Sequence, residues 1–196
     1  MPTGVAIHDP RQQLFDAAER ILLRDGPNAL TSRAVTAEAG CAKGVLHRHF
    51  ADFDAFLAEL VMGRIRRLEG IAALLREAAG KGTVVGNLTT ALTELFDAVA
   101  IAVVSLVIAR DELRARLRAA GSSGIPLMTE AAAVLGGYLA AERDLGRIVP
   151  DADVDVLAPT LLGAAHLLYA AREAGAPDGE AVRRTVTAVV ARVTSP

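Results

Sequence analysis

The chain has 196 residues, enough for one domain or two small ones, and 52% of them are hydrophobic while only 4% are aromatic. Ala, Val and Leu must therefore fill the interior, and because Ala and Leu favour helices and no segment alternates like a run of strands, we expect an all-α fold. The net charge of −2 argues against a polyanion partner for the chain as a whole, and the single cysteine, Cys41, excludes an intramolecular disulfide and fits a reducing cytoplasm.

The first predicted helix begins at Asp9-Pro10, where aspartate can cap free backbone N–H groups and proline fits the first turn. It ends before Gly26-Pro27, two residues that break helices. Its apolar residues recur at helical spacing, which predicts one buried face. With the next two helices this face should form a core of Leu14, Ala18, Ile21, Val35, Ala39, Leu46 and Phe50.

Residues 31–50, TSRAVTAEAGCAKGVLHRHF, predict two short helices joined by a tight turn. Thr31 and Ser32 are suitable N-cap residues, and Gly40 ends the first helix. The second runs from about residue 42 to 49 and is basic, because residues 41–50 include Lys43 and Arg48 but no carboxylate. The pattern fits a helix-turn-helix, whose second helix enters the major groove of DNA, although an ordinary helical hairpin would share it.

The middle of the chain predicts a long helix at 52–78, a break at Gly80-Lys81-Gly82, a central helix at 88–109 and a short helix at 111–119. On the long helix we expect Arg64, Arg66 and Arg67 to face solvent. Residues 98–109 form the most apolar run, but a membrane-spanning helix needs about 20 such residues. We therefore expect a buried helix there and no membrane partner.

Three further helices are predicted towards the C-terminus, at about 125–145, 153–174 and 178–193. Residues 150–153 (PDAD) mark the start of the second, and residues 175–178 (GAPD) separate it from the third. Both of the last two helices carry apolar faces, which must be covered by other parts of this chain or by a partner.

Residues 14–57 resemble the N-terminal domain of the tetracycline-repressor (TetR) family. The matching elements occur in the family's order: LFDAAERIL, RDG, TSRAV, EAG, KGVLHRHF and FDAFL. The resemblance implies a helix-turn-helix domain at 9–52 that binds operator DNA, and a helical domain at 53–196 that binds a small ligand and forms a homodimer. The DNA-contacting residues would be Thr31, Ser32, Arg33, Ala42, Lys43, Gly44, Val45, His47, Arg48 and His49.

The family's last two helices form a four-helix dimer interface. The resemblance therefore implies that the apolar faces of these two helices meet a second subunit. The residues concerned are Leu161, Leu162, Ala165, Leu168, Val182, Val186, Val189 and Val193. For the ligand we consider aromatic and polar residues on otherwise apolar helices, each of which could equally be a packing residue. These candidates are Phe96, Asp97, Ser105, Tyr138, His166 and Tyr169.

The favoured hypothesis is a one-component transcriptional regulator, a repressor that leaves its inverted-repeat operator when a small, apolar effector binds. An alternative is a ligand-binding protein that no longer binds DNA effectively, since His47 and Phe53 replace a tyrosine and a lysine that usually contact phosphates in the family. Nothing predicts an enzyme, because the four histidines lack metal-ligand spacing and neither a nucleophile elbow nor a phosphate-binding loop occurs. We expect no metal and no cofactor.

Overall fold

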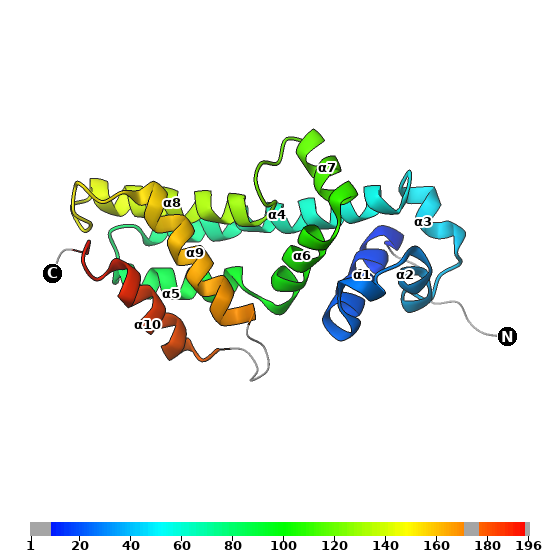
Figure 1. The fold of residues 1–196 in the computed structure, drawn as a ribbon, viewed down its shortest axis with the longest axis horizontal. Coiled ribbons are helices and arrows are strands. Elements are labelled where there is room, and N and C mark those ends of the chain that lie inside the picture. Colours follow the sequence, from blue (N-terminus) through cyan, green and yellow to red (C-terminus); the bar gives the residue numbers. More distant parts are fainter. Residues whose placement is uncertain (1–8, 171–176, 195–196) are drawn as a thin grey trace.

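The computed structural model of the chain describes residues 9–170 and 177–194. Within these ranges the fold is all-α, as predicted. The helices are α1 (Pro10–Asp25), the short 3-10 helix η1 (Pro27–Ala29), α2 (Ser32–Glu38), α3 (Gly44–His49), α4 (Phe53–Ala78), α5 (Val84–Leu95), α6 (Ala98–Ala109), α7 (Asp111–Ala119), α8 (Met128–Asp144), α9 (Val154–Ala170) and α10 (Gly179–Val190). The molecule is elongated, with α1–α3 at one end, α5 and α8–α10 at the other, and α4 reaching between them (Figure 1).

The N-terminal unit consists of α1, η1, α2 and α3, and the predicted caps define it. The Asp9 carboxylate accepts the backbone N–H groups of Arg11 and Gln12 at the start of α1, and Gly26 ends that helix at φ +79°, a conformation that glycine adopts without steric cost. The core predicted for this unit is confirmed, except that Ala39 is only half-buried. Three aromatic rings extend the core onto α4: Phe15 meets Phe50 edge to face at 5.6 Å and stacks on Phe56 at 5.3 Å, centroid to centroid.

Helix α4 has 26 residues, about 39 Å at 1.5 Å per residue, and belongs to both ends of the molecule. Its first turn is capped by the Asp52 carboxylate, which accepts the Ala55 N–H at 2.6 Å. The helix packs against α3 near its start, and against α5, α7 and α8 along the rest of its length. A tilt of α4 would therefore move the N-terminal unit relative to the C-terminal helices.

The predicted single helix at 88–109 is wrong: two helices, α5 and α6, occupy this stretch and meet at an angle of 64°. The chain turns at Phe96 and Asp97, where the Asp97 carboxylate accepts the backbone N–H of Ala100 at 2.7 Å. Asp97 is thus the N-cap of a new helix. An aspartate side chain favours such a break because its oxygen accepts a backbone N–H that would otherwise bond within a continuous helix. The turn directs α6 towards the N-terminal unit, where it packs against α1 and η1.

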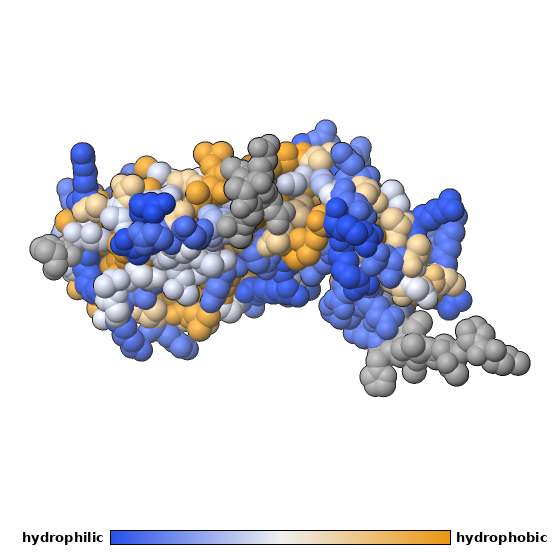
Figure 2. All heavy atoms as spheres, turned by 90° about the horizontal axis from the view of Figure 1, so that it is seen from below, coloured by the Kyte–Doolittle hydropathy of each residue, from blue (hydrophilic) through white to orange (hydrophobic). Residues whose placement is uncertain are grey.

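The C-terminal body is built from α5, α8, α9 and α10 around the second half of α4. Helix α10 buries one valine stripe, Val182, Val186 and Val190, and packs on α5 and α9. The predicted end of α9, at residue 174, lies outside the described residues. No single helix in the described ranges is long and apolar enough to cross a membrane. Helices α5 and α6 reach that length and apolarity only when taken together, and they are bent at their junction. In Figure 2 hydrophilic residues cover much of the N-terminal end, and apolar residues gather over the body.

Candidate DNA interface and ligand cavity

The second helix of the helix-turn-helix, α3, presents its basic residues to solvent. Lys43, His47 and Arg48 are exposed, and in the described part of the chain their side chains form no hydrogen bond or ion pair. Leu46, on the opposite side of the same helix, is completely buried and anchors it to α1 and α2. The side chains that could contact DNA are therefore available on a helix whose position is determined by its core residue.

Arg11, which the sequence analysis did not single out, holds the end of α3. Its Nη1 donates to the backbone carbonyl of His49 at 3.1 Å, its guanidinium lies 4.5 Å from the Phe50 ring centroid, and it pairs with Glu59 of α4. A cation at a helix C-terminus is stabilising, because the carbonyl groups there lack partners in the helix. Nothing in the sequence pairs Arg11 with His49, since 38 residues separate them.

The first helix of the motif, α2, carries the remaining predicted contacts. The Thr31 hydroxyl caps it by accepting the Ala34 N–H at 3.1 Å, and Arg33 is exposed. The Ser32 hydroxyl is buried and makes no hydrogen bond to the described residues. In the turn and α3, Ala42 and Gly44 are exposed whereas Val45 and His49 are half-buried. That these residues contact DNA stays a prediction.

Phe53, at the position where the family usually has a lysine, is used for packing. Its ring stacks on Phe56 at 5.7 Å, and the Arg110 guanidinium lies 5.5 Å from its centroid. Arg110 also approaches the Asp54 carboxylate at 3.4 Å and the Leu30 carbonyl at 3.5 Å. The junction of α6 and α7 is thereby joined to the start of α4 and to the chain before α2.

Three of the predicted ligand residues lie together in the body. The Phe96 ring stacks on Tyr169 at 5.3 Å and lies 5.9 Å from the His166 ring. The Nδ1 atom of His166 is buried and makes no hydrogen bond to the described residues. Asp97 follows Phe96 but turns its carboxylate to the cap of α6 and to Arg64.

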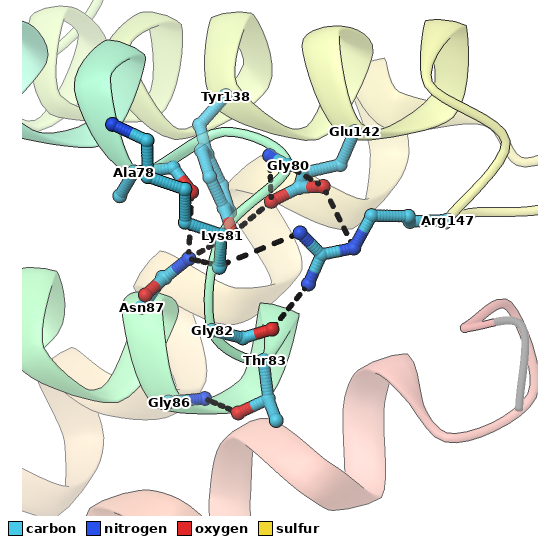
Figure 3. Close-up of polar contacts among 10 residues, drawn as sticks. All are labelled: Ala78, Gly80, Lys81, Gly82, Thr83, Gly86, Asn87, Tyr138, Glu142 and Arg147. Atoms are coloured by element: carbon cyan, nitrogen blue, oxygen red, sulfur yellow. Dashed lines mark hydrogen bonds and ion pairs between the residues drawn. The ribbon is translucent and has the colours of Figure 1, made fainter.

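The other two predicted ligand residues lie elsewhere. Ser105 is exposed on α6, and its hydroxyl donates to the Ile101 carbonyl in the preceding turn. Tyr138 is buried in a polar network at the far end of the body, where its hydroxyl donates to Glu142 at 2.6 Å and accepts from Asn87 at 2.9 Å (Figure 3). Burial and the neighbouring Glu142 carboxylate raise the pKa of Tyr138 far above its usual value, so the hydroxyl stays protonated and donates. These contacts indicate that Tyr138 has a structural role.

A small apolar cavity lies where α4, α5, α6, α8 and α9 meet. Its volume is about 20 Å³, room for about one water molecule. The lining residues are Leu68, Leu95, Phe96, Ala100, Val104, Leu127, Met128, Ala131 and Leu162. A second cavity of about 40 Å³ shares four of these residues and adds charged ones from α4 and the α5–α6 turn. Both cavities are small, so an effector would have to displace side chains to enter.

Arg64 lies beside the second cavity and corrects the expectation of a solvated arginine row on α4. Only 5% of Arg64 is exposed, whereas Arg66 and Arg67 face solvent as predicted. Its Nη2 donates to the Asp97 carboxylate at 2.7 Å, and its Nε lies 3.8 Å from Glu19 of α1. Arg64 can occupy the buried side of α4 because the long aliphatic part of its side chain packs with the core while its charge is paired.

A sequence profile for "Bacterial regulatory proteins, tetR family" matches residues 14–60, from α1 to the first turns of α4. Residues 14–60 therefore form a DNA-binding domain of the TetR type. Proteins of that family are transcriptional regulators. Such regulators are transcription factors rather than enzymes. A search of curated protein sequences finds no match to the chain.

Solved structures share the TetR fold with this protein over nearly its whole length. A TetR-family regulator from Agrobacterium tumefaciens has a TM-score of 0.72 at 16% identity, covering 95% of this chain and 98% of that one. FadR from Bacillus subtilis, solved with stearoyl-CoA, has a TM-score of 0.70 at 17% identity, covering 93% and 98%. A protein from Mesorhizobium loti assigned to the family has a TM-score of 0.67 at 18% identity, covering 97% and 100%. These likenesses concern the fold alone.

The residues predicted for the dimer interface are mostly inside the subunit. Leu161, Leu162, Ala165, Val182 and Val186 are each less than 4% exposed, because α9 and α10 pack these sides on α5, on α8 and on each other. A side chain without exposed area cannot contact a second subunit in this conformation. Leu168, Val189 and Val193 are half-buried. The outer sides of the two helices are the surfaces still available.

The described residues contain no group of three or more side chains suited to hold a metal ion. Cys41, in the turn between α2 and α3, is half-buried, and desolvation raises the pKa of its thiol. A thiol with a raised pKa is less often a thiolate and therefore less reactive. Half-burial and the raised pKa therefore indicate that Cys41 is a packing residue.

Proposed function

We propose that this TetR-family regulator binds an inverted-repeat operator as a homodimer, and that it represses transcription until a small effector releases it. The observation that carries operator binding is the exposed basic surface of α3, where Lys43 and Arg48 face solvent without a partner in the described ranges. A helix of this kind fits the major groove, where cationic side chains reach phosphates and base edges. Operator binding would place the protein in the cytoplasm with the chromosome.

The homodimer rests on the outer side of α9. Two large apolar residues are exposed there, Val156 at 58% and Leu167 at 73%. The exposed side follows alternating steps of four and three residues, the spacing at which one helix meets another along a seam. Its positions are Val156, Thr160, Gly163, Leu167 and Ala170. A second copy of this chain would cover the seam and bring two α3 helices onto one face of the duplex.

Two connections between the body and the DNA-binding unit support the proposal that an effector releases the protein from DNA. Helix α4 belongs to both, and Arg110, at the junction of α6 and α7, contacts Asp54 and the Leu30 carbonyl. An effector that separates α4 from α6 would shift both connections at once. It weakens DNA binding only to the extent that it prefers the shifted conformation.

Selection of binding sites from a pool of random DNA duplexes tests the proposal with the full-length protein. We expect enrichment of an inverted repeat whose half-sites lie about 34–36 Å apart, one turn of the duplex. The variant Lys43→Gln with Arg48→Gln should enrich nothing, while Lys81→Gln, which removes the chain's other lysine, should enrich the same repeat. Enrichment of no sequence by the wild-type protein, or of the same sequence by the double variant, would contradict operator binding through α3.

One observation favours a second candidate, a ligand-binding protein with weakened DNA binding. Phe53 packs on Phe56 and beside Arg110, so it offers no charge to a phosphate where the family usually has a lysine. In that case the selection would enrich no sequence, although the body would still bind its ligand.

A further inference from the structure

Arg64 is a buried cation at the meeting point of three helices. It projects from α4 towards Asp97, which caps α6, and towards Glu19 of α1. Its Nε atom is buried and has no hydrogen-bond partner in the described part of the chain, since 3.8 Å to Glu19 is too long for one. A buried donor without an acceptor is costly, and an incoming anion would satisfy it.

Arg67 lies one helical turn after Arg64 and is exposed, with no partner among the described residues. Both arginines line two cavities, each open to solvent: a larger one of about 220 Å³ between α1 and α4, and the second cavity of about 40 Å³ between α4, α5 and α6. A small anion entering either cavity would therefore meet both guanidinium groups.

The second cavity adjoins the apolar one. The two share Leu68, Leu95, Ala100 and Leu127, so they are separated by side chains rather than by backbone. The other residues that line the apolar cavity are all apolar as well, among them Phe96, Val104 and Leu162. Polarity thus falls steadily from the arginines to the centre of the body.

We propose that these adjoining cavities are the effector site and that its ligand is an amphipathic anion, a carboxylate with an unbranched aliphatic tail. The carboxylate pairs with Arg64 and Arg67, and the tail enters the apolar cavity. Of the carboxylates nearby, Asp97 is engaged by Arg64 and by the α6 cap, and Glu19 faces Arg64. Glu94 also lines the second cavity and is exposed, so a cationic ligand is the competing class. The inference rests on the proposed function for the claim that the ligand acts on DNA binding.

Leu127 is the side chain that must move to admit the tail. It lines both the apolar cavity and the second cavity, is 5% exposed, and has φ +74°, the one positive φ of a non-glycine residue in the described ranges. The Glu130 carboxylate accepts its N–H at 2.6 Å and holds this backbone conformation. Rotation of the Leu127 side chain out of the wall would join the cavities, and a change of its backbone to negative φ would relieve an unfavourable geometry.

A carboxylate on Arg64 would also compete with Glu19 and Asp97 for the same guanidinium. Those two residues belong to α1 and to the start of α6, so their release would loosen the contact between the DNA-binding unit and the body. The ligand would in this way couple its own binding to the position of α1.

Calorimetry on the full-length protein tests the ligand class with three probes that share a tail, all below their micelle concentrations: decanoate, 1-decanol and decyltrimethylammonium. We expect decanoate to bind at least about tenfold more tightly than decanol, because a hydrogen bond to a charged group contributes about that factor to affinity. Octanoate should bind more weakly than decanoate by about threefold to fourfold per methylene removed. Equal affinity for decanoate and decanol, tightest binding of the ammonium probe, or no binding of any probe would overturn the proposal.

Matched variants locate the site. Arg67→Gln should lower decanoate affinity about tenfold and leave decanol unchanged. Arg66→Gln should change neither, because Arg66 is exposed on the same helix but lines only the larger cavity of about 220 Å³. Ala100→Leu, which fills the shared wall, should weaken decanoate and decanol together. An equal effect of Arg66→Gln and Arg67→Gln, or undiminished binding by a folded Ala100→Leu protein, would contradict the assignment.

The same samples separate this inference from the proposed function. Binding-site selection without any probe reports on DNA binding alone, and calorimetry without DNA reports on the cavity alone. Loss of decanoate binding with an intact operator would overturn the ligand class and leave the regulator function in place.

Discussion

Asp52 and Arg116 join the start of α4 to α7 across 64 residues of sequence. One carboxylate oxygen of Asp52 accepts the Ala55 N–H at 2.6 Å and caps α4, while the other lies 2.8 Å from Nη2 of Arg116. The same side chain therefore begins the helix that joins the DNA-binding unit to the body and attaches that helix to α7. Both side chains are half-exposed, so the pair should influence local opening more than overall stability.

We expect Arg116→Gln to accelerate amide hydrogen exchange in α7 by about twofold to fivefold, the effect of losing an exposed ion pair. Asp52→Asn should do the same, because asparagine retains a capping oxygen but not the charge. The double variant should exchange no faster than either single one. Arg118→Gln is the control, since Arg118 is exposed on α7 without a partner among the described residues. Additive effects of the two substitutions would show that the residues act independently.

The Asp52 carboxylate should also give a pH-dependent contribution to stability. Its pKa is lowered, first by the hydrogen bond from Ala55 and then by Arg116. A carboxyl with a lower pKa in the folded than in the unfolded protein stabilises the fold fully above the ordinary value of about 3.9, and this contribution is lost as pH falls through the lowered pKa. The stability difference between wild type and Asp52→Asn should be constant above about pH 5 and disappear in acid. A difference that persists at the lowest pH would contradict the charge-based explanation.

Operator affinity should depend on salt through Lys43. Each phosphate contact contributes about 0.9 to the slope of log affinity against log salt concentration, because bound counterions are released. Lys43→Gln should therefore reduce the slope by about 1 per subunit if the ammonium contacts a phosphate. Lys81, in the turn between α4 and α5, provides the control: Lys81→Gln should leave the slope unchanged. Titrations at several salt concentrations measure both, and equal slopes for the two variants would place Lys43 away from the phosphates.

The buried network around Glu142 should contribute to stability without affecting ligand or DNA. Glu142 has no exposed area, and its carboxylate accepts from the Tyr138 hydroxyl and lies 3.4 Å from Nε of Arg147. Tyr138→Phe removes one of these donors and should lower the free energy of unfolding by about 1–3 kcal/mol in urea denaturation. Tyr169→Phe is matched to it, since the Tyr169 hydroxyl has no hydrogen-bond partner in the described ranges, and should change stability by about 0.5 kcal/mol or less. Equal losses in the two variants would argue against the network.

The proposed dimer should dissociate when the apolar seam on α9 receives a charge. Leu167→Glu places a carboxylate where two subunits would meet and should yield a monomer by light scattering at micromolar concentration. Leu145→Glu changes a comparably exposed leucine at the end of α8 and should leave the dimer intact. A wild-type monomer, or a dimeric Leu167→Glu protein, would contradict the seam.

Helix ends follow local chemistry, and these could be predicted from the sequence. Asp9 and Thr31 cap the helices that were expected to begin beside them, and the glycines at 26 and 80–82 lie between helices. The turn at Phe96 and Asp97 was missed because apolar residues continue on both sides of it without a glycine or proline. The aspartate was the available signal, but an aspartate within an apolar run does not decide whether a helix continues.

Composition, caps and the basic stretch at 31–50 were therefore sufficient to determine an all-helical chain with a helix-turn-helix near its start. Only the tertiary structure decided which of three successive arginines, Arg64, Arg66 and Arg67, is buried, and which side of α9 faces solvent. Helix α9 is apolar nearly all round, so its periodicity singles out no face. The buried side of such a helix depends on the neighbours that pack against it, and those neighbours are brought there by contacts between residues far apart in the chain.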